Sequence, residues 1–269
     1  MSRRRLDAEL VRRGLARSRE HASDLIADGR VKVGGQVAGK AATQVETGAA
    51  ILVATGDAGP EYVSRGGHKL AGALEAFGDL KVAGRVCLDA GASTGGFTDV
   101  LLRAGASRVY AVDVGRAQIA WSLRTDDRVS VLERVNVRDL TPELLGQPEA
   151  PAPDLVVGDL SFISLRLVLE PLRRCVAPGT DYAIMVKPQF EVGKELVGAG
   201  GVVRDPELRA DAVRGVAAHA WTLGLGALGV TASPLPGPAG NVEYFLWLRA
   251  GAPRLDEADL ARAVAEGPQ

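Results

Sequence analysis

The stretch CLDAGASTGGFTDVLLRAGA, residues 87–106, places a buried-strand pattern, a glycine-rich turn and a helical pattern in direct succession. The apolar run ends at Asp89, the turn contains Gly91 and Gly95, and the helical pattern starts near Gly96. Glycines let the backbone approach a ligand closely, and a helix start presents free N–H groups to it. The stretch therefore predicts a strand–turn–helix unit of an α/β domain, with a ligand site at the turn.

Apolar runs and helical patterns alternate through most of the remaining chain. The expected strands cover residues 85–91, 108–114, 128–134, 153–161, 182–188, 227–233 and 242–249, and the expected helices cover 96–105, about 116–123, 164–175 and 206–223. This alternation is typical of a parallel sheet with helices on both faces. We predict an α/β fold with a seven-stranded doubly wound sheet over residues 64–250, its last two strands tightly joined and the last antiparallel. The tail, residues 251–269, contains a short helical pattern.

The first 59 residues form a separate pattern, and residues 55–63 are a candidate linker. RLDAELVRRGL predicts a helix that stops at Gly14, and REHASDLIADG predicts a second helix that Ser18 caps and Gly29 ends. VKV and AAILVA follow as short strands. This part of the chain is expected to be a small α+β domain.

Composition excludes several classes of protein. The chain has 269 residues, of which 46% are hydrophobic, so a folded core is expected. Two cysteines and three scattered histidines indicate neither a disulfide framework nor a metal site. The start of the chain lacks the apolar segment of a signal peptide, and the uncharged stretch 217–235 contains glycines and a proline that favour a helix end plus a strand over a membrane span. We expect a cytoplasmic protein without metal or membrane partners.

Positive charge is concentrated near the amino terminus. Residues 1–59 carry ten Lys and Arg against seven Asp and Glu. Such a patch is able to contact nucleic-acid phosphates, although a solvated helix face is an equally good interpretation of composition alone. The residues expected to contact RNA are Arg3, Arg4, Arg5, Arg12, Arg17, Arg19, Lys32 and Arg65.

The glycine-rich turn favours one cofactor over another. A nicotinamide dinucleotide site would require Gly-x-Gly-x-x-Gly, but position 93 is Ser. The spacing from Asp89 to Gly96 resembles the S-adenosylmethionine motif, and Asp113 ends the next strand, where an acid typically accepts the ribose hydroxyls. Glycine turns also occur for strand–helix packing alone. The expected cofactor residues are Asp89, Gly91, Ala92, Ser93, Thr94, Gly95, Gly96, Phe97, Asp113, Val114, Asn136, Val137 and Asp159.

Four charged residues are expected to meet beside that cofactor. Lys187 and Asp159 end adjacent strands, whose carboxyl ends share the ligand crevice of a doubly wound sheet. Glu243 opens the last strand, and Lys69 begins the helix that leads into the fold. Each charge alone is more often solvated or a helix cap. The order Lys, Asp, Lys, Glu resembles the tetrad of FtsJ-type ribose 2′-O-methyltransferases.

The residue types suit that chemistry. A ribose hydroxyl is a weak acid, so its attack on a methyl group requires that its proton be withdrawn or its lone pair aimed. A lysine that is partly desolvated beside a second cation can serve as the base. We expect Lys187 to act on the hydroxyl, Lys69 and Glu243 to orient substrate and lysine, and Asp159 to lie between Lys187 and the sulfonium.

The amino-terminal pattern resembles the S4 RNA-binding domain over residues 3–55. With YVSRGGHKL, LDAGASTGGFTD, DLSFISL, VKPQFEVGK, GGVVRDP and SPLPGPAGNVEYFLWL following it, the chain is similar to the TlyA family of ribosomal RNA 2′-O-methyltransferases. The resemblance implies a Rossmann-like methyltransferase that uses S-adenosylmethionine to modify cytidine in ribosomal RNA, within ribosomal subunits. Some members of the family modify both 16S and 23S RNA and others only 23S RNA, and the full amino-terminal unit and tail resemble the first type. It further implies an influence on sensitivity to capreomycin and viomycin.

Rival interpretations come from other classes. One is a ribosome- or RNA-binding protein that has lost its activity, which the four intact charged positions disfavour; another is membrane lysis, because the family has also been called haemolysin. A nicotinamide reductase is more distant. Trp121, Phe162 and Phe190 could stack on a base or belong to the core. The glycine-rich segment 188–205 could be a lid whose Glu191 and Lys194 are simply solvated.

Overall fold

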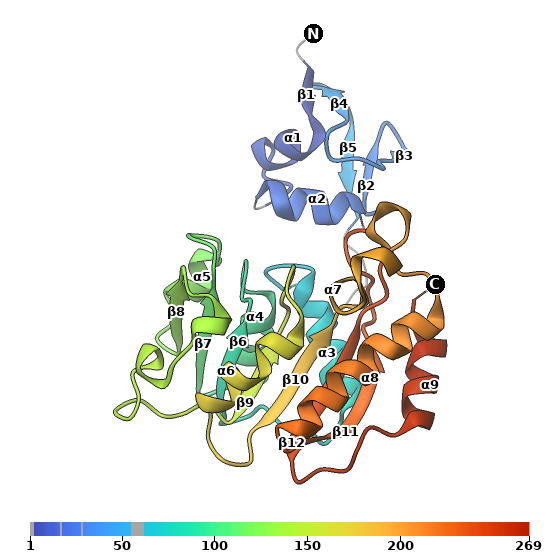
Figure 1. Ribbon diagram of the computed structural model, residues 1–269. Coiled ribbons are helices and arrows are strands. Elements are labelled where there is room, and N and C mark those ends of the chain that lie inside the picture. Colours follow the sequence, from blue (N-terminus) through green and yellow to red (C-terminus); the bar gives the residue numbers. More distant parts are fainter. Residues whose placement is uncertain (1–2, 17, 28, 55–61, 269) are drawn as a thin grey trace. The chain divides into compact units, whose positions relative to one another are not determined.

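The structure is a computed structural model that describes residues 3–16, 18–27, 29–54 and 62–268 (Figure 1). The chain divides into two compact units, residues 1–65 and 66–269. Most of the candidate linker, together with Arg17, lies outside the described residues.

The first unit is a small α+β domain. Its apolar core includes Leu6 and Leu10, which lie one helical turn apart, and Leu25 from the second helix. Ser18 Oγ accepts a hydrogen bond from the backbone N of His21 at 3.0 Å, which is the expected helix cap. The elements are β1 (Arg3–Arg5), α1 (Leu6–Arg12), α2 (Arg19–Ala27), β2 (Val31–Val33), β3 (Gln36–Val37), β4 (Gln44–Glu46) and β5 (Ile51–Val53). β1 pairs with β4, and β2 lies between β3 and β5.

The second unit is a seven-stranded sheet with helices on both faces (Figure 1). The strands are β6 (Val86–Ala90), β7 (Arg108–Asp113), β8 (Val129–Glu133), β9 (Leu155–Gly158), β10 (Asp181–Val186), β11 (Leu225–Ala232) and β12 (Tyr244–Ala250). The helices are α3 (Gly66–Ala76), α4 (Gly96–Arg103), α5 (Trp121–Arg124), α6 (Leu169–Arg174), α7 (Pro188–Glu191), α8 (Pro206–Thr222) and α9 (Glu257–Glu266). The predicted fold class is confirmed.

Strand order determines where a ligand binds. The order is β11-β12-β10-β9-β6-β7-β8, and β12 is antiparallel to both of its neighbours, as predicted for the last strand. Chain order reverses between β6 and β9, and a doubly wound sheet binds ligands outside the carboxyl ends of its strands at such a point. Because β12 runs the other way, its beginning lies at this same edge.

Two expected helices are shorter or less regular in the structure than in the prediction. Residues 116–120 are not helical: Ala117 has φ 53° and its backbone N donates to Glu133 Oε1 at 2.7 Å, so α5 begins only at Trp121. The helix expected over 164–175 is a 3-10 turn, Leu165–Leu167, followed by α6.

The junction of the last two strands also differs from expectation. β11 and β12 pair side by side, but residues 233–243 form a loop between them. The loop matters for the site, because it ends at Glu243.

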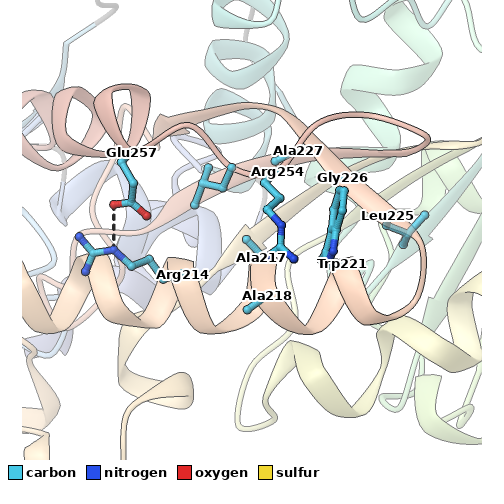
Figure 2. A pocket seen from close by; sticks show the side chains of 10 residues that line it. Arg214, Ala217, Ala218, Trp221, Leu225, Gly226, Ala227, Arg254 and Glu257 are labelled. Carbon is cyan, nitrogen blue, oxygen red and sulfur yellow. Dashed lines mark hydrogen bonds and ion pairs between the residues drawn. The ribbon is translucent and has the colours of Figure 1, made fainter.

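The tail is part of the second unit. Arg254 stacks over the Trp221 ring at 4.6 Å, and Arg214 Nε lies 2.9 Å from Glu257 Oε2 (Figure 2). These contacts border a cavity of about 200 Å³ between α8 and the segment that leads to α9. Leu260 of α9 is fully buried. The tail therefore packs against α8 and β11.

Candidate active site

A cavity of about 700 Å³ lies at the carboxyl edge of the sheet, within the size range of small-molecule sites. The ends of β6, β7 and β9 contribute to its wall. Of the expected cofactor residues, those that line it are Gly91, Ser93, Asp113, Val114, Asn136, Val137 and Asp159. The cavity is also lined by Gln118, Arg138 and residues 160–164, 167 and 168.

The glycine-rich turn brings strand ends close together. Gly91 has φ +86°, and a Cβ there would lie 2.8 Å from the backbone O of Asp159. Gly95 has φ +98°, and a Cβ there would collide with the Leu123 side chain. These two glycines are therefore required by packing around the cavity. The other turn residues expected to bind cofactor, Ala92, Thr94, Gly95, Gly96 and Phe97, lie in the turn or the first turn of α4 and do not line the cavity.

Asp113 ends β7 at the cavity wall. Its carboxylate accepts hydrogen bonds from the backbone N of Ser93 at 2.8 Å and of Gly115 at 2.6 Å. Each carboxylate oxygen can accept a second bond. Asp113 is thus fixed in orientation and retains acceptor capacity toward the cavity.

Asp89 is fully buried at the end of β6. Thr98 Oγ1 donates to its Oδ2 at 2.7 Å, and its Oδ1 has no hydrogen-bond partner among the described residues. Burial raises the pKa of Asp89 to about 7, partly offset by the Thr98 bond. Such an acceptor is suited to a cationic group.

The pKa of Asp89 has a measurable consequence for the ligand-free protein. Between about pH 4 and pH 7 the folded protein retains a proton that the unfolded chain has released, so the free energy of unfolding falls as pH rises, by up to about 1.4 kcal/mol per pH unit. Urea unfolding of wild type and Asp89→Asn across pH 5–8 measures this slope, which the variant should reduce. Exposed Asp79→Asn is the control, and an Asp89→Asn slope equal to the wild-type slope would contradict the prediction.

The cavity suits S-adenosylmethionine, which carries an adenine, a ribose diol and an amino-acid end with an ammonium group. Asp113 and Asn136 provide polar acceptors at the wall, and Leu160 and Ile163 provide apolar surface. Asp89 is fully buried and is not among the residues that line the cavity, so the fit rests on Asp113, Asn136 and the apolar wall. The residues present therefore fit this cofactor.

The four expected charges form two ion pairs. Lys187 Nζ lies 2.5 Å from Asp159 Oδ1, and Lys69 Nζ lies 2.5 Å from Glu243 Oε2. The β10–β12 register pairs Val186 with Tyr244, so the next residues, Lys187 and Glu243, stand opposite one another. Directly opposed residues in antiparallel strands have neighbouring side chains. The backbone thus brings both pairs to one edge.

The Lys69–Glu243 pair depends on two close approaches that the sequence analysis missed. A Cβ at Gly72, within α3, would lie 2.7 Å from Pro234 Cγ, and one at Gly237 would lie 2.6 Å from Glu243 Oε1. Glycine inside a helix is otherwise unfavourable. Gly72, three residues after Lys69, was therefore a signal in the sequence that another part of the chain lies close to this helix.

Two other polar residues at the site were missed. Ser161 Oγ accepts a hydrogen bond from Lys187 Nζ at 2.8 Å, so the lysine has a second partner. Glu191 was interpreted as solvated but is buried, with 9% of its surface exposed. It accepts bonds from Ser164 Oγ and the backbone N of Leu165. A hydroxyl two residues after Asp159 was the only sequence signal for Ser161.

The aromatic residues considered for stacking differ in exposure. Phe162 is 90% exposed beside the cavity, and its ring centroid lies 5.2 Å from that of Phe190. Trp121 is 75% exposed at the start of α5. Neither Phe162 nor Trp121 is a core residue.

The basic residues of the first unit fall into two groups. Arg3, Arg4 and Lys32 are exposed on short strands. By contrast Arg5, Arg12 and Arg19 form ion pairs with two buried acids, as follows: Arg5 Nη2–Asp7 Oδ2 2.9 Å, Arg19 Nη2–Asp7 Oδ2 3.0 Å and Arg12 Nη2–Glu9 Oε1 2.6 Å. The sequence analysis did not separate this second group from the first.

The acids that hold these arginines are ionised. Arg5 is the main cause of a pKa of Asp7 far below its ordinary value, and Arg12 and Arg13 lower the pKa of Glu9 to about 2. Arg13 also donates to the backbone O of Thr47 and Ala49, so its role is structural. Arg65 is half-buried at the end of the first unit. Among the described residues no group of three or more His, Cys, Asp or Glu is placed to hold a metal.

Comparisons with known proteins identify both units. Residues 62–250 match the FtsJ-like methyltransferase family, and residues 4–51 match the S4 domain. The chain is 58% identical over 275 residues to the 16S/23S rRNA (cytidine-2'-O)-methyltransferase TlyA of Mycobacterium tuberculosis, covering 100% of both chains. The chain belongs to the TlyA family. It is a methyltransferase of FtsJ-like fold that carries an S4 domain.

Two further relatives agree with this membership of the TlyA family. The YqxC protein of Bacillus subtilis is 42% identical over 269 residues, 97% of this chain and 93% of that one. A solved structure from Streptococcus thermophilus, which carries the name hemolysin, is 37% identical, covers 99% of this chain and 96% of that chain, and superposes with a TM-score of 0.78.

Proposed function

We propose that this TlyA-family protein is an S-adenosylmethionine-dependent methyltransferase that modifies the ribose 2′-hydroxyl of cytidine in ribosomal RNA, in the cytoplasm. The observation that carries the proposal is the placement of the Lys187–Asp159 and Lys69–Glu243 ion pairs at the edge of the sheet that holds the cofactor-sized cavity. The name of the relative from M. tuberculosis supports the choice of cytidine and of 16S and 23S RNA.

The lysines and carboxylates have distinct tasks in this proposal. Bound S-adenosylmethionine supplies an electrophilic methyl group. Lys187 Nζ would accept the hydroxyl proton as the ribose oxygen bonds to the methyl carbon and the sulfur–methyl bond breaks, with S-adenosylhomocysteine as the leaving group. Asp159 and Ser161 orient the amine, and the buried Lys69–Glu243 pair forms the neighbouring wall. Much of the rate enhancement would then come from alignment.

The proposal is tested with purified protein, tritiated S-adenosylmethionine and ribosomal subunits that lack the modification. Label in alkali-resistant 2′-O-methylcytidine is the expected result. Label on a nucleobase would contradict the assignment of the ion pairs. Cofactor binding without transfer to either subunit or to naked RNA would favour the lapsed RNA-binding protein.

The RNA contacts of the first unit are a separate prediction. Arg4 is exposed on β1, so Arg4→Ala should weaken binding to RNA of any sequence and reduce the slope of log affinity against log salt by about 1 if it contacts one phosphate. Fluorescence anisotropy in a salt series measures both. Arg262→Ala, in α9 of the other unit, is the charge-matched control. An unchanged salt slope for Arg4→Ala would contradict the prediction.

The proposal also includes an expected effect on antibiotic sensitivity. Modification of both subunits should influence sensitivity to capreomycin and viomycin, as the family resemblance implies.

Membrane lysis is the second candidate function, since a similar structure carries the name hemolysin. Within the described part of the chain, no helix has the length and apolarity needed to cross a bilayer. Leakage of liposomes on addition of purified protein would support lysis.

A further inference from the structure

The short helix α7 starts one residue after Lys187 and contacts the loop that follows β9. Lys187 Nζ donates to Ser161 Oγ at 2.8 Å, and the Phe190 ring lies against the Phe162 ring. Glu191, at the end of α7, contacts the next part of the same loop. Successive residues from Lys187 to Glu191 therefore contact successive residues of the loop from Ser161 to Leu165.

Glu191 makes the most extensive of these contacts. Its Oε2 accepts a bond from Ser164 Oγ at 2.6 Å, and its Oε1 accepts one from the backbone N of Leu165 at 2.7 Å. Arg166 Nε lies 3.5 Å from Oε2, and Arg166 Nη2 donates to the backbone O of Glu191 at 3.0 Å. A buried carboxylate needs such partners, and these are all in one loop.

The loop forms a wall of the cofactor cavity. Residues 159–164, 167 and 168 line the cavity, between the contacts of Lys187 and those of Glu191. Phe162 has φ 62°, an unfavourable backbone conformation for a bulky side chain, and it is 90% exposed. Strained conformations persist only where the surroundings fix them, and Phe162 has little packing of its own. Ser161, directly before Phe162, is bonded to Lys187, and Ser164, two residues after Phe162, is bonded to Glu191.

We propose that Glu191 is a positioning residue that holds the 159–165 loop against the end of β10, so that the cofactor cavity and Lys187 keep one relative geometry. The inference rests on the proposed methyltransferase function. Glu191 acts through the loop and touches neither cofactor nor substrate.

The principal test is Glu191→Gln, which preserves size but replaces one acceptor oxygen by an NH₂ donor. A donor that faces the N–H of Leu165 loses that bond, and a donor that faces Ser164 Oγ meets an oxygen that already accepts bonds from Arg166 N and Nε, both at 3.2 Å. We expect the dissociation constant of S-adenosylhomocysteine, measured by calorimetry, to rise at least tenfold. The KM for S-adenosylmethionine should rise and kcat should fall, while the affinity for RNA stays at the wild-type value.

Matched variants separate positioning from loss of folding. Glu195→Gln removes the same charge from an exposed residue of the same segment and should bind S-adenosylhomocysteine as wild type does. Ser164→Ala should raise the dissociation constant by itself, and adding it to Glu191→Gln should give less than the product of the two effects, because both disrupt one contact. Unaltered circular dichroism confirms the fold.

Several outcomes would overturn the inference. Wild-type cofactor affinity and kcat in Glu191→Gln would do so, as would multiplicative effects in the double variant. If Glu191→Gln does not fold, Ser164→Ala decides: reduced cofactor affinity supports the inference, and wild-type affinity overturns it. Cofactor binding is measured without transfer, so a wild-type protein that binds cofactor but methylates no RNA would contradict the proposed function alone.

Discussion

Replacing Lys187 by alanine is expected to lower the rate of 2′-O-methylation by about 10²–10⁴-fold, the usual contribution of a general acid or base. Lys187 Nζ forms an ion pair with Asp159 and a hydrogen bond with Ser161, and only 10% of the side chain is exposed. No other lysine is bonded to these two residues in the described structure. Single-turnover transfer from labelled cofactor to undermodified subunits measures the loss.

The interpretation requires that binding survive the substitution. S-adenosylhomocysteine should still bind Lys187→Ala, with an affinity reduced far less than the rate, because Lys187 does not line the cavity and Glu191 still holds the loop at Ser164 and Leu165. Lys187→Arg should also be inactive, since the guanidinium group stays protonated and therefore cannot accept the hydroxyl proton. Lys194→Ala, on the exposed segment that follows, is the control. A rate in Lys187→Ala within a few-fold of wild type would refute the role.

The sheet was predictable because its signals are local. The run before Asp89 and the run from Ala183 to Val186 read as buried strands, and both are buried in the structure. The carboxyl-edge rule then placed Asp159 beside Lys187 without any structural information. Their ion pair agrees with that placement, while the chemical roles await the experiments above.

The missed features depend on partners distant in sequence. Residues 116–120 have the composition of a helix, but the contact of Ala117 with Glu133 holds them in a turn. Glu191 reads as an exposed acid because its partners, Ser164 and Leu165, are more than twenty residues away. Tertiary contacts override local preference at both places.

The arginines illustrate a second limit of sequence reasoning. A count of charges treated Arg4 and Arg5 alike, yet Arg4 is exposed and Arg5 is paired with the buried Asp7. The pairing fixes the Arg5 guanidinium and offsets its charge. A count of charges does not show which arginines have an acidic partner at hand.

The second large effect is expected at the other ion pair. Lys69 and Glu243 have side chains only 7% and 1% exposed, so Glu243→Ala would leave a buried ammonium without its carboxylate. Removing one partner of a buried pair typically costs about 3–5 kcal/mol, whereas replacing both by apolar residues is often nearly neutral. Glu243→Ala should therefore reduce the free energy of unfolding by about that amount, as measured by urea denaturation.

A double variant separates folding from catalysis at this pair. Lys69→Met with Glu243→Leu removes both charges and should recover most of the stability lost in Glu243→Ala. Methyl transfer should remain low in the double variant, because Glu243 stands opposite Lys187 and an apolar side chain there offers nothing to orient the lysine or the ribose. Recovery of stability together with wild-type transfer would show that the pair serves the fold alone. Recovery of stability without transfer would place Lys69 and Glu243 in the catalytic arrangement with Lys187.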